Sequence, residues 1–333
     1  MRPWGELSAA AGERARAAAR LVEGVVHAAG DGIADVVETA GHAIEGGLCA
    51  AGERAGRLPA AGGALRAIAA WSGGIVAGIA RLVGAAVKGG FGVVAGALGG
   101  ALEVGCGVLL LQRALVLGGL VDLGAGVAGL VLLVVGKLVS LVQHALFLQR
   151  RARPLTAEEK AMLRRVFRRS LSLYNVRLVE GRAGVFGLSD RPFTLGNTIY
   201  LKQYLSTVPG LLVHECVHAW QYQSIGPRYA VDALGAQQLL PDAYDWEGEL
   251  KRGRAAWTVF NKEAQAQLIE DTWLGGSLTA EGRTTTGGGC FFDIGGDGAT
   301  VVFSYQGTDH TALAVGAATS LRKRLNARWS KLL

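Results

Sequence analysis

The chain has 333 residues, a net charge of +7 and 50 glycines, so it is long enough for two domains with a hydrophobic core each. Its excess of basic residues comes from short clusters without a nucleic-acid-binding motif, which predicts no nucleic-acid partner and favours anionic lipid, although solvated basic faces would give the same clusters. The four cysteines lie far apart, which excludes a disulfide-stapled small fold and predicts free thiols. The first residues lack the features of a cleavable signal peptide, so we expect a membrane-associated protein or one secreted by another route.

Composition changes near Pro154, because glycine crowds into residues 12–136 whereas every tyrosine and asparagine lies beyond that point. We therefore predict four segments. These are an amphipathic Ala/Gly-rich helical segment (1–63), an apolar, membrane-active helical region (64–153), an α+β domain with a small sheet (154–274), and a glycine-rich loop with short strands and a cationic C-terminal helix (275–333). The predicted fold class is mostly α, with an N-terminal helical hairpin or bundle.

The first segment contains an eleven-residue repeat. Ala29-Gly30, Ala40-Gly41 and Ala51-Gly52 recur at this spacing. Since eleven residues make about three helical turns, their small side chains align as one stripe along a nearly straight amphipathic helix. Such a stripe fits a helix that packs on neighbouring helices, and it also fits a helix that lies on a membrane surface.

The next region contains two apolar stretches, Gly89 to Gln112 and Ala114 to Gly136, each long enough to cross a bilayer at about 1.5 Å per residue. Each stretch holds one acid, Glu103 or Asp122, which would be costly in hydrocarbon if ionised. The acids favour helices that pack together, or that insert when protonated, over ordinary lipid-exposed spans.

Glycines in this region predict how the helices pack and turn. Gly92, Gly96 and Gly100 form a ridge of small residues that allows close helix approach, and Gly118-Gly119 is expected to be a turn. We predict helical hairpins over residues 65–153 that engage membrane lipids. A soluble bundle with a core of small residues is the alternative.

The third segment begins with a predicted helix, because Thr156 and Glu159 have capping-box spacing. Asn175 to Glu180 is expected to be extended. In Phe193 to Leu201, apolar and polar residues alternate, which predicts one half-buried strand.

A helix opened by Ser206, Thr207 and Pro209 follows, and it carries the string His214-Glu215-Cys216-Val217-His218. Residues four apart share one helix face, so both imidazoles are able to bind one metal ion. Glu215 is offset by about 100° from His214 and is expected to reach a water molecule at the metal without ligating.

This HExxH pattern predicts Zn²⁺ as cofactor and Glu215 as general base. Zinc lowers the pKa of water towards about 7 and polarises a carbonyl, so that hydroxide is available at neutral pH. Two helix histidines without a metal are the alternative. Cys216 is expected to be a small core residue beside the site.

A third protein ligand is needed, and Ser224 rules out the extended HExxHxxGxxH pattern. Glu263, on a helix predicted from about Ala255 to Asp271, is the best candidate. The rival acids are Asp242, Asp245, Glu247 and Glu249. Glu270 and Asp271 are candidates for orienting a histidine.

The strings FTLGNTIYL, LLVHECVHAWQYQ and FNKEAQAQLIED resemble the zincin-type metallopeptidase domains of bacterial contractile-injection-system cargo and related toxins. More broadly they are similar to gluzincins, whose third ligand is a glutamate in an ExxA helix, which Glu263 and Ala266 match. Gln267 departs from the aspartate of many gluzincins.

The resemblance implies a zincin-like fold for the α+β domain and a protein or peptide substrate. It also implies that Phe193 to Leu201 is an edge strand that pairs with substrate backbone. The residues assigned to substrate binding in this way are Thr194, Gly196, Asn197 and Thr198.

The oxyanion stabiliser stays open among Tyr229, Tyr244 and His310. The first function hypothesis is a zinc peptidase that is secreted or injected as an effector or toxin, with a secretion apparatus as a possible partner. The second is a membrane-resident housekeeping peptidase. The third is a catalytically inactive zincin scaffold that acts as a binding or docking module.

Overall fold

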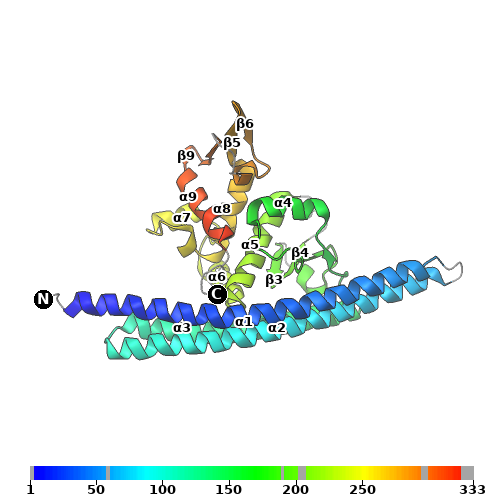
Figure 1. The fold of residues 1–333 in the computed structure, drawn as a ribbon, viewed down its shortest axis with the longest axis horizontal. Coiled ribbons are helices and arrows are strands. Elements are labelled where there is room, and N and C mark those ends of the chain that lie inside the picture. Colours follow the sequence, from blue (N-terminus) through cyan, green and yellow to red (C-terminus); the bar gives the residue numbers. More distant parts are fainter. Residues whose placement is uncertain (1–3, 58–60, 189–190, 202–207, 294–298, 324–333) are drawn as a thin grey trace, which may run out of the picture. The chain divides into compact units, whose positions relative to one another are not determined.

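The computed structural model describes residues 4–57, 61–188, 191–201, 208–293 and 299–323, with the side chains of residues 4–7 and 123 outside the description. The chain is mostly α-helical, with long N-terminal helices followed by a region of small sheets (Figure 1), and this confirms the predicted fold class. It divides into two compact units, residues 1–146 with 225–231, and residues 147–224 with 232–333. The second unit therefore begins a few residues before Pro154.

Three helices form most of the first unit: α1 (Trp4–Ala55), α2 (Gly62–Leu109) and α3 (Arg113–Ala145). Helix α2 packs against both α1 and α3 (Figure 1). Helices α2 and α3 are each long and apolar enough to cross a membrane.

The predicted turn at Gly118-Gly119 is wrong, because both glycines lie inside α3 and the chain reverses at Leu110–Gln112 instead. Gly119 serves close packing, since a Cβ there would lie 2.5 Å from the Gly100 carbonyl oxygen. The predicted ridge of small residues on α2 thus packs against α3. The glycines of this ridge allow the backbones of α2 and α3 to approach closely.

The eleven-residue repeat of α1 lies in the interface with α2. A Cβ at Gly30, Gly41 or Gly52 would come within 2.5 Å of the Cβ atoms of Phe91, Ala80 and Ala69, respectively. These three α2 residues are themselves eleven apart, so the repeat keeps the two antiparallel helices in register over its whole length. Helix packing therefore explains the small-residue stripe.

The second unit begins with β1 (Arg153–Pro154) and α4 (Ala157–Phe167), whose predicted capping box between Thr156 and Glu159 is confirmed. Strand β2 (Arg177–Glu180) lies in the segment predicted to be extended. A short 3₁₀ helix, η1 (Gly184–Gly187), follows.

The single strand predicted over Phe193 to Leu201 is wrong. It is a hairpin of β3 (Phe193–Leu195) and β4 (Thr198–Leu201) around Gly196, whose φ is +62°. The positive φ, which glycine adopts without strain, reverses the chain at that point. The sheet order is β1-β2-β4-β3, so β4 is internal and β3 lies at the end of the sheet.

Twelve elements follow this sheet in the described part of the chain. They are α5 (Pro209–Ile225), α6 (Arg228–Leu239), α7 (Trp246–Lys251), η3 (Trp257–Val259), α8 (Lys262–Gly275), β5 (Ser277–Ala280), β6 (Arg283–Thr286), η4 (Cys290–Asp293), β7 (Thr300–Val302), β8 (Ser304–Tyr305), β9 (Thr308–Asp309) and α9 (Thr311–Arg322). One hydrophobic core joins α4, α5, α8 and α9.

Two further expectations change, and two others lie outside the described residues. The helix predicted from Ala255 begins only at Lys262, because the Asn261 side chain caps it there. The glycine-rich loop predicted at the start of the fourth segment (275–333) contains the β5–β6 hairpin, which turns at Gly282 with a φ of +72°. Ser206 and Thr207, expected to open α5, and the end of the predicted cationic helix lie outside the described residues.

The glycine register of α1 predicts opposite effects for two Gly→Ala substitutions. Gly41→Ala should destabilise the first unit by about 1–3 kcal/mol, because its Cβ would overlap Ala80. Gly32→Ala should stabilise it by up to about 1 kcal/mol, since nothing lies within 4 Å of a Cβ there and alanine favours the helix. The denaturation midpoint of the helical circular-dichroism signal measures both, and shifts of the same sign would contradict this register.

Candidate metal centre

Helix α5 holds His214 and His218 rigidly because most of its surface is buried. Val213, Cys216 and Val217 lie in the core with no exposed area. Burial raises the pKa of the Cys216 thiol well above its ordinary value, which is consistent with an inert core residue. The two imidazoles, four residues apart, share the remaining face.

The first turn of α8 brings Glu263 to these histidines. The Asn261 side chain accepts hydrogen bonds from the backbone N–H groups of Glu263 (2.9 Å) and Ala264 (3.0 Å). Asn261 is in turn held by Glu249, which accepts from its backbone N–H at 3.1 Å. A carboxylate in the first turn of a helix is also favoured by the helix dipole.

The three side chains converge on one point. The Nε2 atoms of His214 and His218 lie 3.6 and 3.3 Å from Glu263 Oε2, and the three residues are 4, 6 and 1% exposed, in the order His214, His218 and Glu263. Tetrahedral ligands about 2.0–2.1 Å from one zinc ion lie about 3.3 Å apart. The cluster of His214, His218 and Glu263 therefore has the spacing of a metal site.

The hydrogen-bonding state of Glu263 also fits a metal ion. Its buried Oε2 has no hydrogen-bond partner among the described residues, whereas Oε1 accepts from Gln237 Nε2 at 3.0 Å. A buried carboxylate oxygen without a donor is costly unless a cation lies nearby. The donor set of two imidazoles and one carboxylate suits zinc.

The outer nitrogen of each imidazole is also bonded. His214 Nδ1 lies 3.1 Å from Glu270 Oε2, and His218 Nδ1 lies 2.8 Å from Gln221 Oε1. The Gln221 amide donates onward to Gln265 Oε1 and to the Lys262 carbonyl, both at 3.0 Å. When a metal ion binds, partners of this kind keep the proton on the outer nitrogen and leave Nε2 free to ligate.

Glu215 lies beside the cluster and not in it. Thr194 Oγ1 donates to Glu215 Oε2 at 2.7 Å, which ties the carboxylate to β3. Burial raises the pKa of Glu215, and the two neighbouring histidines oppose that shift.

The four rival acids lie outside the cluster. Asp242 accepts from the Tyr244 backbone, Asp245 caps α7, and Glu247 lies 3.5 Å from His310. Glu249 is fully buried between Arg252 and Arg254. Each of these carboxylates thus has a structural partner.

Of the residues predicted to bind substrate, only Thr194 contacts Glu215, the acid beside the cluster. Gly196 forms the hairpin turn, and the Asn197 side chain accepts from Gln223 Nε2 at 2.8 Å. Thr198 is buried on the internal strand β4.

The three candidates for oxyanion stabilisation lie in different places. The Tyr244 ring lies 5.9 Å from the His214 ring, and its hydroxyl accepts from Gln237 Nε2 at 3.2 Å. Burial raises the pKa of Tyr244 to about 12. Tyr229 is buried in the first unit, and His310 packs on Trp246.

Sequence reasoning missed the roles of Gln221, Gln237 and Asn261, and it gave Thr194 a different one. Gln221 stands three residues after His218, and residues at this spacing are neighbours on a helix face. This spacing could have identified Gln221 as a partner of His218. Asn261 carries the signal of a helix cap. Gln237 comes from a different helix, so no local pattern marks it.

Comparisons of this chain with protein-family models, with curated proteins and with solved structures found no match. The resemblance to zincin domains stays a prediction.

The contacts of α8 predict different roles for two adjacent acids. Glu270→Ala should weaken zinc binding by about 10–100-fold, because His214 loses the partner of its outer nitrogen. Asp271→Ala should leave the affinity close to wild type, since Asp271 accepts from Trp246 and Gln267 instead. Titration against a competing chelator measures both constants, and equal losses would contradict the assignment.

Zinc binding should release protons and tighten as the pH rises. Burial opposes protonation of His214, but the carboxylates of Glu263 and Glu270 outweigh it and raise its pKa to about 10; the pKa of His218 is also raised. Below these pKa values the metal must displace protons, about two if both imidazoles carry one. Calorimetry at pH 7 in buffers of different ionisation enthalpy counts the released protons, and a count of zero would refute this expectation.

Proposed function

We propose that the second unit is a zinc-dependent peptidase that uses Glu215 as its general base. The observation that supports this most is the convergence of the two Nε2 atoms on a Glu263 oxygen that lacks a hydrogen bond. Glu215, one residue after the first histidine, is close enough to serve the same centre without being a ligand.

The bound zinc would polarise the substrate carbonyl and lower the pKa of a water molecule towards about 7. Glu215 takes a proton from the attacking water and gives it to the leaving amine. Thr194 holds the Glu215 carboxylate in place during both transfers. Burial strengthens Glu215 as a base, because it raises the pKa of the carboxyl group.

Tyr244 is the candidate that we favour for stabilising the oxyanion. Its ring lies beside His214, and a pKa of about 12 keeps the phenol protonated at neutral pH, as a hydrogen-bond donor must be. Gln237 bonds both this hydroxyl and Glu263, so one side chain positions a ligand and the phenol together.

The proposed substrate is a protein or peptide whose backbone pairs with β3. This strand lies at the end of the order β1-β2-β4-β3, where an extended peptide is able to add as a further strand. The support is the geometry of β3 together with the resemblance to zincin domains.

We also propose that residues 65–153 associate with a membrane, since α2 and α3 have sufficient length and apolar character. Delivery as a secreted or injected effector rests on the resemblance alone.

Replacing the base should separate metal binding from chemistry. Glu215→Gln is expected to retain about one zinc ion per chain and to lose peptide hydrolysis by a factor of about 10² or more, because the ligands survive and the base does not. Metal analysis and cleavage of an unstructured protein such as casein measure the two properties.

Asp242→Asn is the matched control. It removes an exposed carboxylate outside the cluster, and it should keep both zinc and activity. Hydrolysis that persists at the wild-type rate in Glu215→Gln would overturn the assignment.

A further inference from the structure

The first unit has its apolar and ionisable side chains arranged in the opposite way to a water-soluble bundle. Over residues 21–51 of α1, 67–111 of α2 and its turn, and 114–146 of α3 and its end, none of the described exposed side chains is ionisable. The exposed positions there include many large aliphatic residues. Examples are Ile33, Val36, Ile79, Val94, Leu98, Leu117, Val131 and Val135.

The inner face of α2 has the complementary composition. Every buried residue of this helix is Gly or Ala, with the exception of Lys88. Water favours large apolar residues inside and charges outside. Inside a lipid bilayer, large apolar side chains are as stable on the outer surface as in the interior. Helices there pack through small residues and keep ionisable groups inside the bundle.

Over residues 21–51, helix α1 also keeps its ionisable side chains away from the exposed surface, although it is not apolar enough to be a candidate membrane-spanning helix by hydropathy. Between residues 21 and 51 it carries five acids and two histidines, all of them buried or half-buried. Three of these acids, Glu38, Glu45 and Asp31, lie towards α2 and α3 together with His42.

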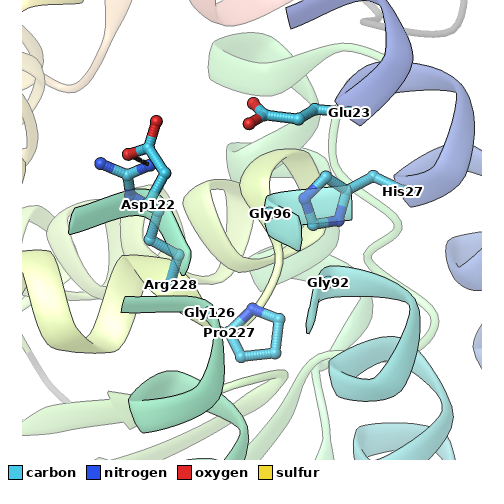
Figure 2. Close-up of a pocket in the computed structure, with 8 residues that line it drawn as sticks. All are labelled: Glu23, His27, Gly92, Gly96, Asp122, Gly126, Pro227 and Arg228. Carbon is cyan, nitrogen blue, oxygen red and sulfur yellow. Dashed lines mark hydrogen bonds and ion pairs between the residues drawn. The ribbon is translucent and has the colours of Figure 1, made fainter. Parts of the chain in front are cut away.

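Several of the interior acids lie beside interior bases. Asp31 pairs with Lys88 of α2 at 2.6 Å, and Glu38 interacts electrostatically with Lys137 of α3. Figure 2 shows Asp122 of α3 paired with Arg228 beside Glu23 and His27, in a small pocket floored by α2 glycines. Acids of α1 thus offset lysines that the two apolar helices could not otherwise carry into lipid.

Exposed arginines lie at both ends of the helical surface that carries no exposed ionisable side chain. Arg14, Arg20 and Arg113 lie at one end, and Arg54 and Arg66 lie at the other. Basic side chains at such borders suit the headgroup layers of an anionic membrane.

We infer that α1, α2 and α3 enter the membrane together, with α1 as a third lipid-embedded helix that contacts acyl chains through its uncharged face. This deepens the proposed membrane association, which assigned lipid contact to residues 65–153 only. Residues 21–51 of α1 extend about 45 Å, against about 30 Å for the hydrocarbon core, which favours a strongly tilted or in-plane unit over an upright one.

Arginine substitutions on the outer face test this inference in the full-length protein. Val36 of α1 is 69% exposed and Val131 of α3 is 55% exposed. Val36→Arg and Val131→Arg should each lower partitioning into phosphatidylcholine–phosphatidylglycerol vesicles by about a hundredfold, because each places a charge in hydrocarbon. Ala17→Arg, on an exposed α1 position between Arg14 and Arg20, should leave partitioning unchanged.

Vesicle flotation measures the bound fraction, at low salt and at about 0.5 M salt, where adsorption by surface arginines is screened. Circular dichroism and zinc content check that the variants fold. A loss with Val131→Arg but not with Val36→Arg would refute a lipid-embedded α1 and leave the two-helix proposal standing. Binding that is absent, that is abolished at about 0.5 M salt, or that is indifferent to both substitutions would refute both proposals. Glu215→Gln should partition as wild type does, so failure of the peptidase proposal is distinguishable.

Discussion

The catalytic proposal depends on one buried carboxylate oxygen. Glu263 Oε2 is enclosed by two imidazoles and has no hydrogen-bond donor among the described residues. An anion in such a place is stable only with a positive charge beside it, and removing one partner of a buried pair costs several kcal/mol. Protons on the histidines supply that charge in the metal-free protein, and a divalent cation supplies it better because three donors satisfy it at once.

The surroundings of the cluster follow from that constraint. Each proposed ligand is held through the atom that faces away from the centre. Glu270 contacts His214 Nδ1, Gln221 contacts His218 Nδ1, and Gln237 donates to Glu263 Oε1. Thr194 does the same for Glu215. These contacts come from α5, α6, α8 and β3, so the site is assembled by long-range packing and not by one motif.

The sequence predicted those parts of the fold and site that local chemistry determines. The spacing of His214 and His218 placed both on one helix face, and the capping box located the start of α4. The eleven-residue repeat predicted a nearly straight helix with one stripe of small residues, and the structure adds the partner residues on α2.

Errors arose where local patterns were ambiguous. Gly196 reverses the chain within an alternating apolar pattern, and Gly118-Gly119 serves packing where a turn was expected. The contacts of Gln237 with Glu263 and Tyr244 depend on tertiary placement, which spacing alone does not encode. The inward orientation of the acids on α1 needed the three helices in place before it became visible.

X-ray absorption at the zinc edge of the purified full-length chain tests the central claim most directly. Near one zinc ion per chain should be found, with two imidazole nitrogens and light oxygen donors at about 2.0–2.2 Å and no sulfur. Replacing Glu263 by alanine should change this spectrum or abolish the metal. A chain that binds no zinc, or that binds it through a cysteine sulfur, would contradict the metal centre described for His214, His218 and Glu263.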